Sequence, residues 1–156
     1  MPARLQGWDY GAPAAYFITA CTHRRRPYFA VVDSGRLSHT PLGELTRDCL
    51  ARVFGTAPSG VVEASVVMPD HLHFLINRDT ADTALPPVDV LVRDLKARVT
   101  HEARSRALIT VHEQLWQRGY FDRIVRSQEE HDVLRAYIET NPLRWSLRRE
   151  RASATR

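Results

Sequence analysis

The centre of this 156-residue chain reads Met68-Pro69-Asp70-His71-Leu72-His73-Phe74-Leu75-Ile76, a pattern that predicts a tight turn followed by a β-strand. Residues i and i+2 of a strand point to the same face of the sheet, so we expect His71 and His73 to project side by side. The apolar residues that alternate with them then face the core. Two adjacent imidazoles on a rigid strand make half of a site for a divalent cation, although two surface histidines would give the same pattern.

The segments on either side of this strand complete a recognisable order of elements. In chain order we expect a strand at 15–23, a helix between Thr40 and Gly55, strands at 61–68 and 71–77, a helix at 88–99, a strand within 108–125 and a helix from the Ser127 cap to about Asn141. The order β-α-β-β-α-β plus a final helix is the ferredoxin-like split βαβ pattern, an α+β sandwich. It predicts an antiparallel sheet with two helices on one face, and both histidines on the other.

Composition favours a single globular domain over 1–156, with an N-terminal arm at 1–13 and a basic C-terminal tail at 143–156. Hydrophobic residues make up 44% of the chain and charged residues 26%, and no apolar run approaches the roughly 20 residues of a membrane span. The N-terminus shows no signal-peptide pattern. Cys21 and Cys49 have no metal-ligand spacing and are too few for a disulfide scaffold. We therefore expect a cytoplasmic protein with no membrane partner.

The charge of the chain favours an anionic partner. The net charge is +4, the isoelectric point is about 9.5, and Lys96 is the only lysine among many arginines. Arginine forks onto phosphate oxygens and stacks on bases, which suits nucleic acid. The arginines cluster at 24–26 and again after residue 143. A GC-rich genome and a solvated charged tail are the alternative explanations of these features.

The last predicted helix adds two polar side chains to its inner stripe. Tyr137 and Asn141 are four residues apart, so they lie on the same helix face, which is the apolar one. Tyr137 could be a core aromatic residue and Asn141 a C-cap before Pro142. Together with His71 and His73, however, they supply two imidazoles, an amide oxygen and a phenol, a set that suits a divalent metal with a nucleophile beside it.

These segments resemble a known family over residues 14–145. Residues 69–73 are similar to the histidine-hydrophobic-histidine motif of HUH nucleases. Residues 116–126 (Trp-Gln-Arg-Gly-Tyr-Phe-Asp-Arg-Ile-Val-Arg), followed by 137–142 (Tyr-Ile-Glu-Thr-Asn-Pro), resemble the signature of REP-associated tyrosine transposases. Those proteins are relatives of the single-strand transposases of small bacterial insertion sequences. The family has a ferredoxin-like fold, in agreement with the element order.

The resemblance implies a reaction and a role for each motif residue. His71, His73 and Asn141 match the metal ligands, for Mg²⁺ or Mn²⁺, and Tyr137, rather than Tyr120, matches the catalytic tyrosine. The implied enzyme is a DNA transposase and single-strand endonuclease that cleaves and rejoins DNA through a 5′-phosphotyrosine intermediate. Its implied partner is single-stranded DNA with hairpins of the REP type. Relatives act as monomers or homodimers, and the sequence does not choose between these assemblies.

Basic and aromatic residues supply candidate contacts to that DNA. The candidates are Arg24, Arg25, Arg26, Arg93, Lys96, Arg98, Arg118, Arg123 and Trp116. Trp116, Tyr16 and Phe17 could stack on bases or could belong to the core. Family members often continue after the Asn-Pro step with an aromatic, Ser-rich segment, whereas here Leu143 leads into Trp145 and an Arg-rich stretch, which leaves the support of Tyr137 open.

Two other classes of protein fit the same residues. A nucleic-acid-binding domain of this fold without turnover would keep the basic residues and lose the role of Tyr137. A metal-dependent phosphodiester hydrolase would use His71 and His73 with water as nucleophile. A histidine-triad hydrolase fits less well, because residue 75 is Leu and the third histidine is missing.

Overall fold

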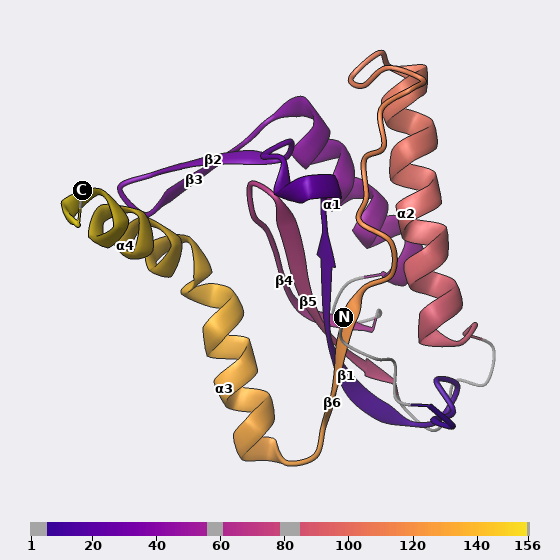
Figure 1. Cartoon of the computed structure of the whole chain (residues 1–156). Helices are drawn as coiled ribbons and strands as arrows, with labels where there is room; N and C mark the ends of the chain where they lie inside the picture. Colours follow the sequence, from indigo (N-terminus) through magenta and orange to yellow (C-terminus); the bar gives the residue numbers. More distant parts are fainter. Residues whose placement is uncertain (1–5, 56–60, 79–84, 156) are drawn as a thin grey trace.

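The computed structural model describes residues 6–55, 61–78 and 85–155, which are built around a four-stranded antiparallel sheet (Figure 1). The strands lie side by side in the order β4 (Val62–Val67), β5 (His71–Arg78), β1 (Ala14–Cys21) and β6 (Phe121–Val125). This is the strand order of the ferredoxin-like fold, so the predicted fold class is confirmed. The breaks expected at 58–60 and over most of 79–87, together with residues 1–5 of the arm and Arg156, lie outside the described residues.

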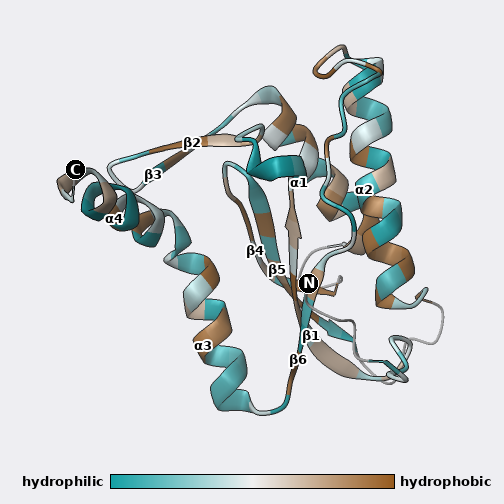
Figure 2. Cartoon of the chain, in the orientation of Figure 1, coloured by the Kyte–Doolittle hydropathy of each residue, from teal (hydrophilic) through white to brown (hydrophobic). Residues whose placement is uncertain are grey.

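Two helices cover one face of the sheet. α1 (Pro41–Phe54) begins at Thr40, whose hydroxyl accepts a hydrogen bond from the Gly43 amide at 3.1 Å, and α2 (Val88–Ser105) runs six residues further than the sequence pattern predicts. Leu72, Phe74 and Ile76 of β5 belong to the same buried cluster as the inner residues of α1 and α2. Figure 2 shows hydrophobic segments in the strands and in these two helices, whereas the last helix is mostly hydrophilic.

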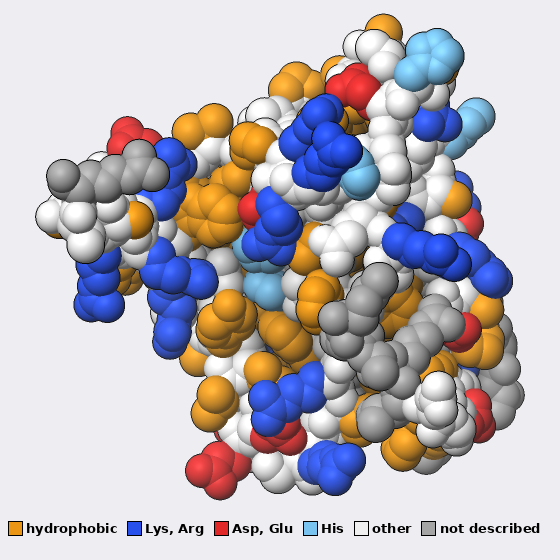
Figure 3. Space-filling model, viewed as in Figure 1, with side chains coloured by type: hydrophobic (Ala, Val, Ile, Leu, Met, Phe, Trp, Pro, Cys, Tyr) orange, Lys and Arg blue, Asp and Glu red, His pale blue; other side chains and the backbone are white. Residues whose placement is uncertain are grey.

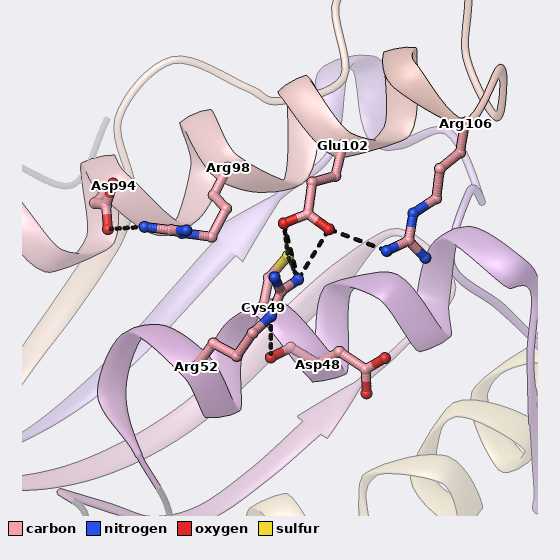
Figure 4. A network of polar contacts seen from close by, with 7 residues as sticks. All are labelled: Asp48, Cys49, Arg52, Asp94, Arg98, Glu102 and Arg106. Carbon is pink, nitrogen blue, oxygen red and sulfur yellow. Dashed lines mark hydrogen bonds and ion pairs between the residues drawn. The ribbon is translucent and has the colours of Figure 1, made fainter.

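Polar contacts join the outer edges of α1 and α2 (Figure 4). The Glu102 carboxylate of α2 accepts from the Arg52 guanidinium of α1 at 2.8 and 2.9 Å, and from Arg106, the residue directly after α2, at 3.1 Å. Arg52 also donates to the buried thiol of Cys49 at 3.2 Å. These contacts account for Cys49 as a structural residue of the helix layer.

A short hairpin that the sequence analysis did not predict follows β1. β2 (Ala30–Asp33) pairs with β3 (Arg36–His39), and Ser34 and Gly35 between them both have positive φ angles, +49° and +78°. Two central residues with φ > 0 are the requirement of the tight turns that suit hairpins. The Ser-Gly pair is therefore the sequence signal for this hairpin, but four-residue strands carry too little alternation to be recognised by pattern alone.

The end of the chain forms two helices where one helix and a tail were expected. α3 (Gln128–Glu139) begins at the predicted Ser127 cap and packs on β4, β5 and β6, so it crosses the sheet face opposite α1 and α2 (Figure 1). After Thr140 the chain turns into α4 (Asn141–Ala154), which is the stretch expected as a basic tail. Pro142 interrupts α3 but is tolerated in the first turn of α4, where its missing N–H is not needed.

The fourth strand is shorter than its sequence suggested. Of the stretch 115–125, only Phe121–Val125 forms β6, and Trp116 makes a single isolated bridge with Thr22. Among the described residues, no helix is long and apolar enough to cross a membrane.

Candidate active site

The two histidines of β5 lie together on the sheet face that α3 crosses. Their ring centroids are 4.6 Å apart, and both residues are buried. His71 pairs across the sheet with Cys21 and His73 with Thr19, while the residues between and after the histidines enter the core on the opposite face. The predicted placement of the histidine pair is confirmed. Figure 3 shows pale-blue histidine atoms near the centre of this face, between hydrophobic and basic side chains.

Asp70 fixes the ring of His71. Its Oδ1 lies 2.6 Å from Nδ1 of His71, and its Oδ2 accepts from Nε of Arg25 at 3.1 Å. Burial alone would raise the pKa of the Asp70 carboxyl, but the hydrogen bond from His71 and the charge of Arg25 outweigh it and hold the pKa below its ordinary value. An ionised carboxylate only accepts hydrogen bonds, so Nδ1 of His71 donates and Nε2 remains for a ligand.

Thr19 forms a hydrogen bond with the corresponding nitrogen of His73. Its Oγ1 lies 2.7 Å from Nδ1 of His73, from the directly opposite position on β1. Burial lowers the pKa of His73 to about 3, and the neighbouring His71, Arg25 and Arg148 add electrostatic contributions in the same direction. His73 is therefore neutral at physiological pH, which is the form that binds a metal ion. Asp70 and Thr19 were not predicted as site residues, although Asp70 directly precedes the histidine motif and Thr19 has no sequence signal.

Tyr137 of α3 lies against this pair. Its ring centroid is 5.4 Å from that of His73, with the two planes at 65°. Phe17 of β1 stacks on His73 at 5.1 Å and meets Tyr137 edge-on at 6.1 Å. The guanidinium of Arg144 lies 5.5 Å from the centre of the Tyr137 ring. Phe17 therefore lines the site, whereas Tyr120, the other tyrosine of the signature, is buried in the core cluster.

Asn141 is fully buried at the start of α4, and among the described residues neither polar atom of its amide has a hydrogen-bond partner. Its neighbours one turn before and one turn after both contact the histidines: Tyr137 contacts His73, and the Trp145 ring lies 5.8 Å from that of His71. A buried amide without a partner is costly, so the position of Asn141 between these two contacts suits its side chain to bind a ligand. This excludes a simple C-cap role for its side chain.

These donors suit a divalent cation. Two imidazoles whose Nδ1 atoms are engaged, plus an amide oxygen with no other partner, are ligands that such an ion accepts, and the groups behind the histidines fix their rings. Among the described residues, no group of three or more His, Cys, Asp or Glu side chains is arranged to hold a metal. An ion here would therefore depend on Asn141 as its third protein ligand.

The basic candidates separate into three sets. Arg25 reaches the site through Asp70, and Arg123 of β6, which pairs with Glu130, lies opposite Phe17 and so on the same sheet face as the histidines. Arg24, Arg26 and Arg118 are exposed. The α2 residues Arg93, Lys96 and Arg98 belong to the helix layer on the other face, and the structure does not bring them to the histidine site.

The structure does not favour the expected DNA contacts of Trp116 and Lys96, because both side chains are engaged within the protein. The Trp116 ring is only 7% exposed and packs against Phe29, and its Nε1 donates to the Lys96 carbonyl at 3.0 Å. The Lys96 ammonium donates to the carbonyls of Gln117 and Gly119, both at 2.7 Å. Both side chains hold the segment before β6 onto α2. Tyr16 is likewise fully buried, so neither aromatic ring is available to a base.

Comparison with known proteins agrees with this geometry. Residues 14–141 match the family described as IS200-like transposases. The chain belongs to the IS200-like transposase family. This transposase is 27% identical over 160 residues to an uncharacterized protein of Haemophilus influenzae, a match that covers 91% of the chain and 87% of the relative. Because that relative is uncharacterized, the match gives no information about function.

The fold of this IS200-like transposase is also that of a solved relative. The structure is of a REP-associated tyrosine transposase bound to a REP hairpin, with a TM-score of 0.65 and 17% identity, covering 91% of this chain and 73% of the other. The sequence match thus confirms the wider family of insertion-sequence transposases to which the resemblance pointed, and the structural match confirms the predicted fold. A DNA-cleaving and strand-transferring enzyme follows from the family in general terms.

Proposed function

We propose that this IS200-like transposase cuts and rejoins single-stranded DNA beside hairpins of the REP type, with Tyr137 as nucleophile and a Mg²⁺ or Mn²⁺ ion held by His71, His73 and Asn141. The observation that carries the proposal is the packing of the Tyr137 ring on His73, one helical turn before the unsatisfied amide of Asn141. A REP hairpin is bound in the structural neighbour, which makes hairpin DNA the first substrate to test.

The reaction follows from what the residues can do. The Tyr137 oxygen forms a bond to the scissile phosphorus, the bond from phosphorus to the 3′ oxygen breaks, and the phenol proton is balanced by the one gained at the released 3′-OH. The strand on the 3′ side of the cut stays on Tyr137 as a 5′-phosphotyrosine, and its rejoining to another 3′-OH reverses the step. A bound divalent ion supplies charge neutralisation at the phosphate. Asp70 and Thr19 hold the two imidazoles in orientation.

The test uses hairpin oligonucleotides from DNA that flanks the gene, labelled at the 3′ end and incubated with Mg²⁺ or Mn²⁺. A 5′-phosphotyrosine carries the 3′-labelled fragment on the protein, so a denaturing gel should show a labelled protein band for the wild type. We expect the band to be absent for Tyr137→Phe and His71→Ala, and present for Tyr120→Phe, which makes the same chemical change at a core tyrosine.

Two outcomes would contradict the proposal. Cleavage that persists in Tyr137→Phe without a labelled protein band would identify a hydrolase that uses water. Binding without cleavage by every variant, on oligonucleotides that cover the whole flanking region, would identify a non-catalytic DNA-binding domain.

A further inference from the structure

A shallow hollow of about 320 Å³ opens beside Tyr137 on the outer side of α4. It is lined by Tyr137, Arg144, Leu147, Arg148 and Arg151. Figure 3 shows blue basic side chains gathered over α4 on the same face as the histidines. The hollow is therefore basic and adjoins the proposed nucleophile.

Three of its side chains form a line, which we name the arginine ridge: Arg144, Arg148 and Arg151. They follow one another at i, i+4 and i+7, so they lie on one face of α4 and span about 10 Å along its axis. Arg149 belongs to the same helix but is not among the residues that line the hollow. The ridge thus has a direction that leads away from Tyr137.

No carboxylate of the described residues neutralises the charges of the ridge. Arg47, Arg98 and Arg135 on the other helices each pair with a carboxylate one turn away, at 3.0 to 3.5 Å. Among the described residues, no carboxylate pairs with any arginine of the ridge. Guanidinium groups are planar donors that fit phosphate oxygens, so three adjacent ones without a carboxylate partner suit a polyanion.

The helix that carries the ridge is held in place on its other side. Ser146 Oγ accepts a hydrogen bond from the Gly35 amide at 2.8 Å, which ties α4 to the turn of the β2–β3 hairpin. Trp145 packs on His71, and Asn141 is buried. These contacts fix the orientation of the ridge relative to the histidines and Tyr137.

We propose that the arginine ridge binds the phosphate backbone of the DNA strand that Tyr137 attacks, and so sets the path of that strand away from the scissile phosphate. This inference rests on the proposed function and adds to it a binding site for specific strand phosphates. Arg144, which lies over the Tyr137 ring, is nearest the cut, and Arg148 and Arg151 hold the following phosphates.

The test measures binding separately from cleavage. In a Tyr137→Phe background with EDTA, the affinity for a fluorescent single-stranded hairpin oligonucleotide is measured by anisotropy at several salt concentrations. Each phosphate contact removed should reduce the slope of log K against log salt by about 0.7. We expect Arg148→Ala to show this reduction together with a dissociation constant raised about fivefold or more, and Arg148→Ala/Arg151→Ala to show about twice the reduction in slope.

Arg149→Ala is the matched control, because it removes the same charge from the same helix outside the hollow. Equal effects of Arg148→Ala and Arg149→Ala would contradict the proposal and indicate a diffuse positive field instead. Unchanged DNA binding by Arg148→Ala would also contradict it. If the ridge variants behave as expected but the wild type never forms a covalent adduct, the proposed reaction fails and the ridge stands. If the adduct forms and ridge variants bind normally, only the ridge fails.

Discussion

The carboxylate of Asp70 lies 2.6 Å from Nδ1 of His71, and this contact decides which nitrogen of the histidine faces the candidate metal site. A carboxylate behind a metal-binding imidazole fixes both its tautomer and its ring orientation. The same carboxylate also holds Arg25, so the segment after β1, the turn before β5 and the histidine form one unit. The turn residue of the histidine motif is therefore part of the site.

Asp70→Asn should weaken metal binding. The amide cannot hold the His71 ring as strongly and can present either its oxygen or its nitrogen, so the imidazole loses its fixed orientation. Loss of such a partner lowers metal affinity by about 10- to 100-fold. Titration of the protein with Mn²⁺, followed by electron paramagnetic resonance, measures the change. Asp48→Asn, on the exposed side of α1, is the control, and equal affinities in all three proteins would contradict the role of Asp70.

Asn141→Leu should separate metal binding from stability. Leucine has a similar volume and removes two buried polar atoms that have no partner, so the metal-free variant should be about as stable as the wild type, or more stable. Thermal unfolding with and without Mn²⁺ tests this. The rise in Tm that Mn²⁺ gives the wild type should be largely lost in the variant. A metal-free variant less stable than the wild type by 2 kcal/mol or more, on the order of an unsatisfied polar group, would show instead that Asn141 has a structural role.

The fold was predictable because its elements carry strong local signals. The alternation around His71, the capping residues Thr40 and Ser127, and the apolar stripes of three helices each indicate an element, and their order selects the sheet topology. The hairpin of β2 and β3 was not predictable by pattern, since strands of four residues hold too few alternating positions. The continuation into α4 was missed because Pro142 ends one helix and begins the next.

The candidate site was predictable only where its residues are close both in the sequence and in space. His71 and His73 are neighbours within one strand, and Tyr137 and Asn141 are four residues apart across the junction of α3 and α4, so sequence spacing alone places each pair close together. Thr19 reaches His73 only through the pairing of β1 with β5. Trp116 shows the reverse case. An aromatic residue in a signature motif is equally suited to packing and to stacking on a base, and its burial favours packing.

Gly43→Ala should strongly destabilise the fold. A Cβ atom at this position of α1 would lie 1.9 Å from the carbonyl oxygen of Phe29, a backbone atom that cannot move alone. The clash would push α1 away from the segment that leads into β2, at a cost of about 3 kcal/mol. Urea unfolding measures the loss. Glu44→Ala, at the next and exposed position, should cost far less, and comparable losses for the two variants would show that the close approach at Gly43 is not the cause.

Stability should fall as the pH rises through the range above about 6.5, because of one ion pair on α3. Nε2 of His131 bonds the Glu63 carboxylate of β4, and this hydrogen bond is the main reason why the pKa of His131 is raised above its ordinary value of 6.5. A group whose pKa is higher in the folded state than in the unfolded state stabilises the fold. This contribution is fully present below the unfolded-state pKa and is lost as the pH rises through the folded-state pKa. The contact ties the first half of α3, the helix of Tyr137, to the sheet.

The free energy of unfolding, measured with urea between pH 5.5 and 8.5 (a range set by the unfolded histidine pKa of about 6.5), tests this dependence. His131→Gln should remove part of the fall, because glutamine can bond Glu63 but carries no charge to lose. His112→Gln, at an exposed position in the loop after α2, should leave the wild-type slope unchanged. Parallel curves for the wild type and His131→Gln would contradict the ion pair as the source of the slope.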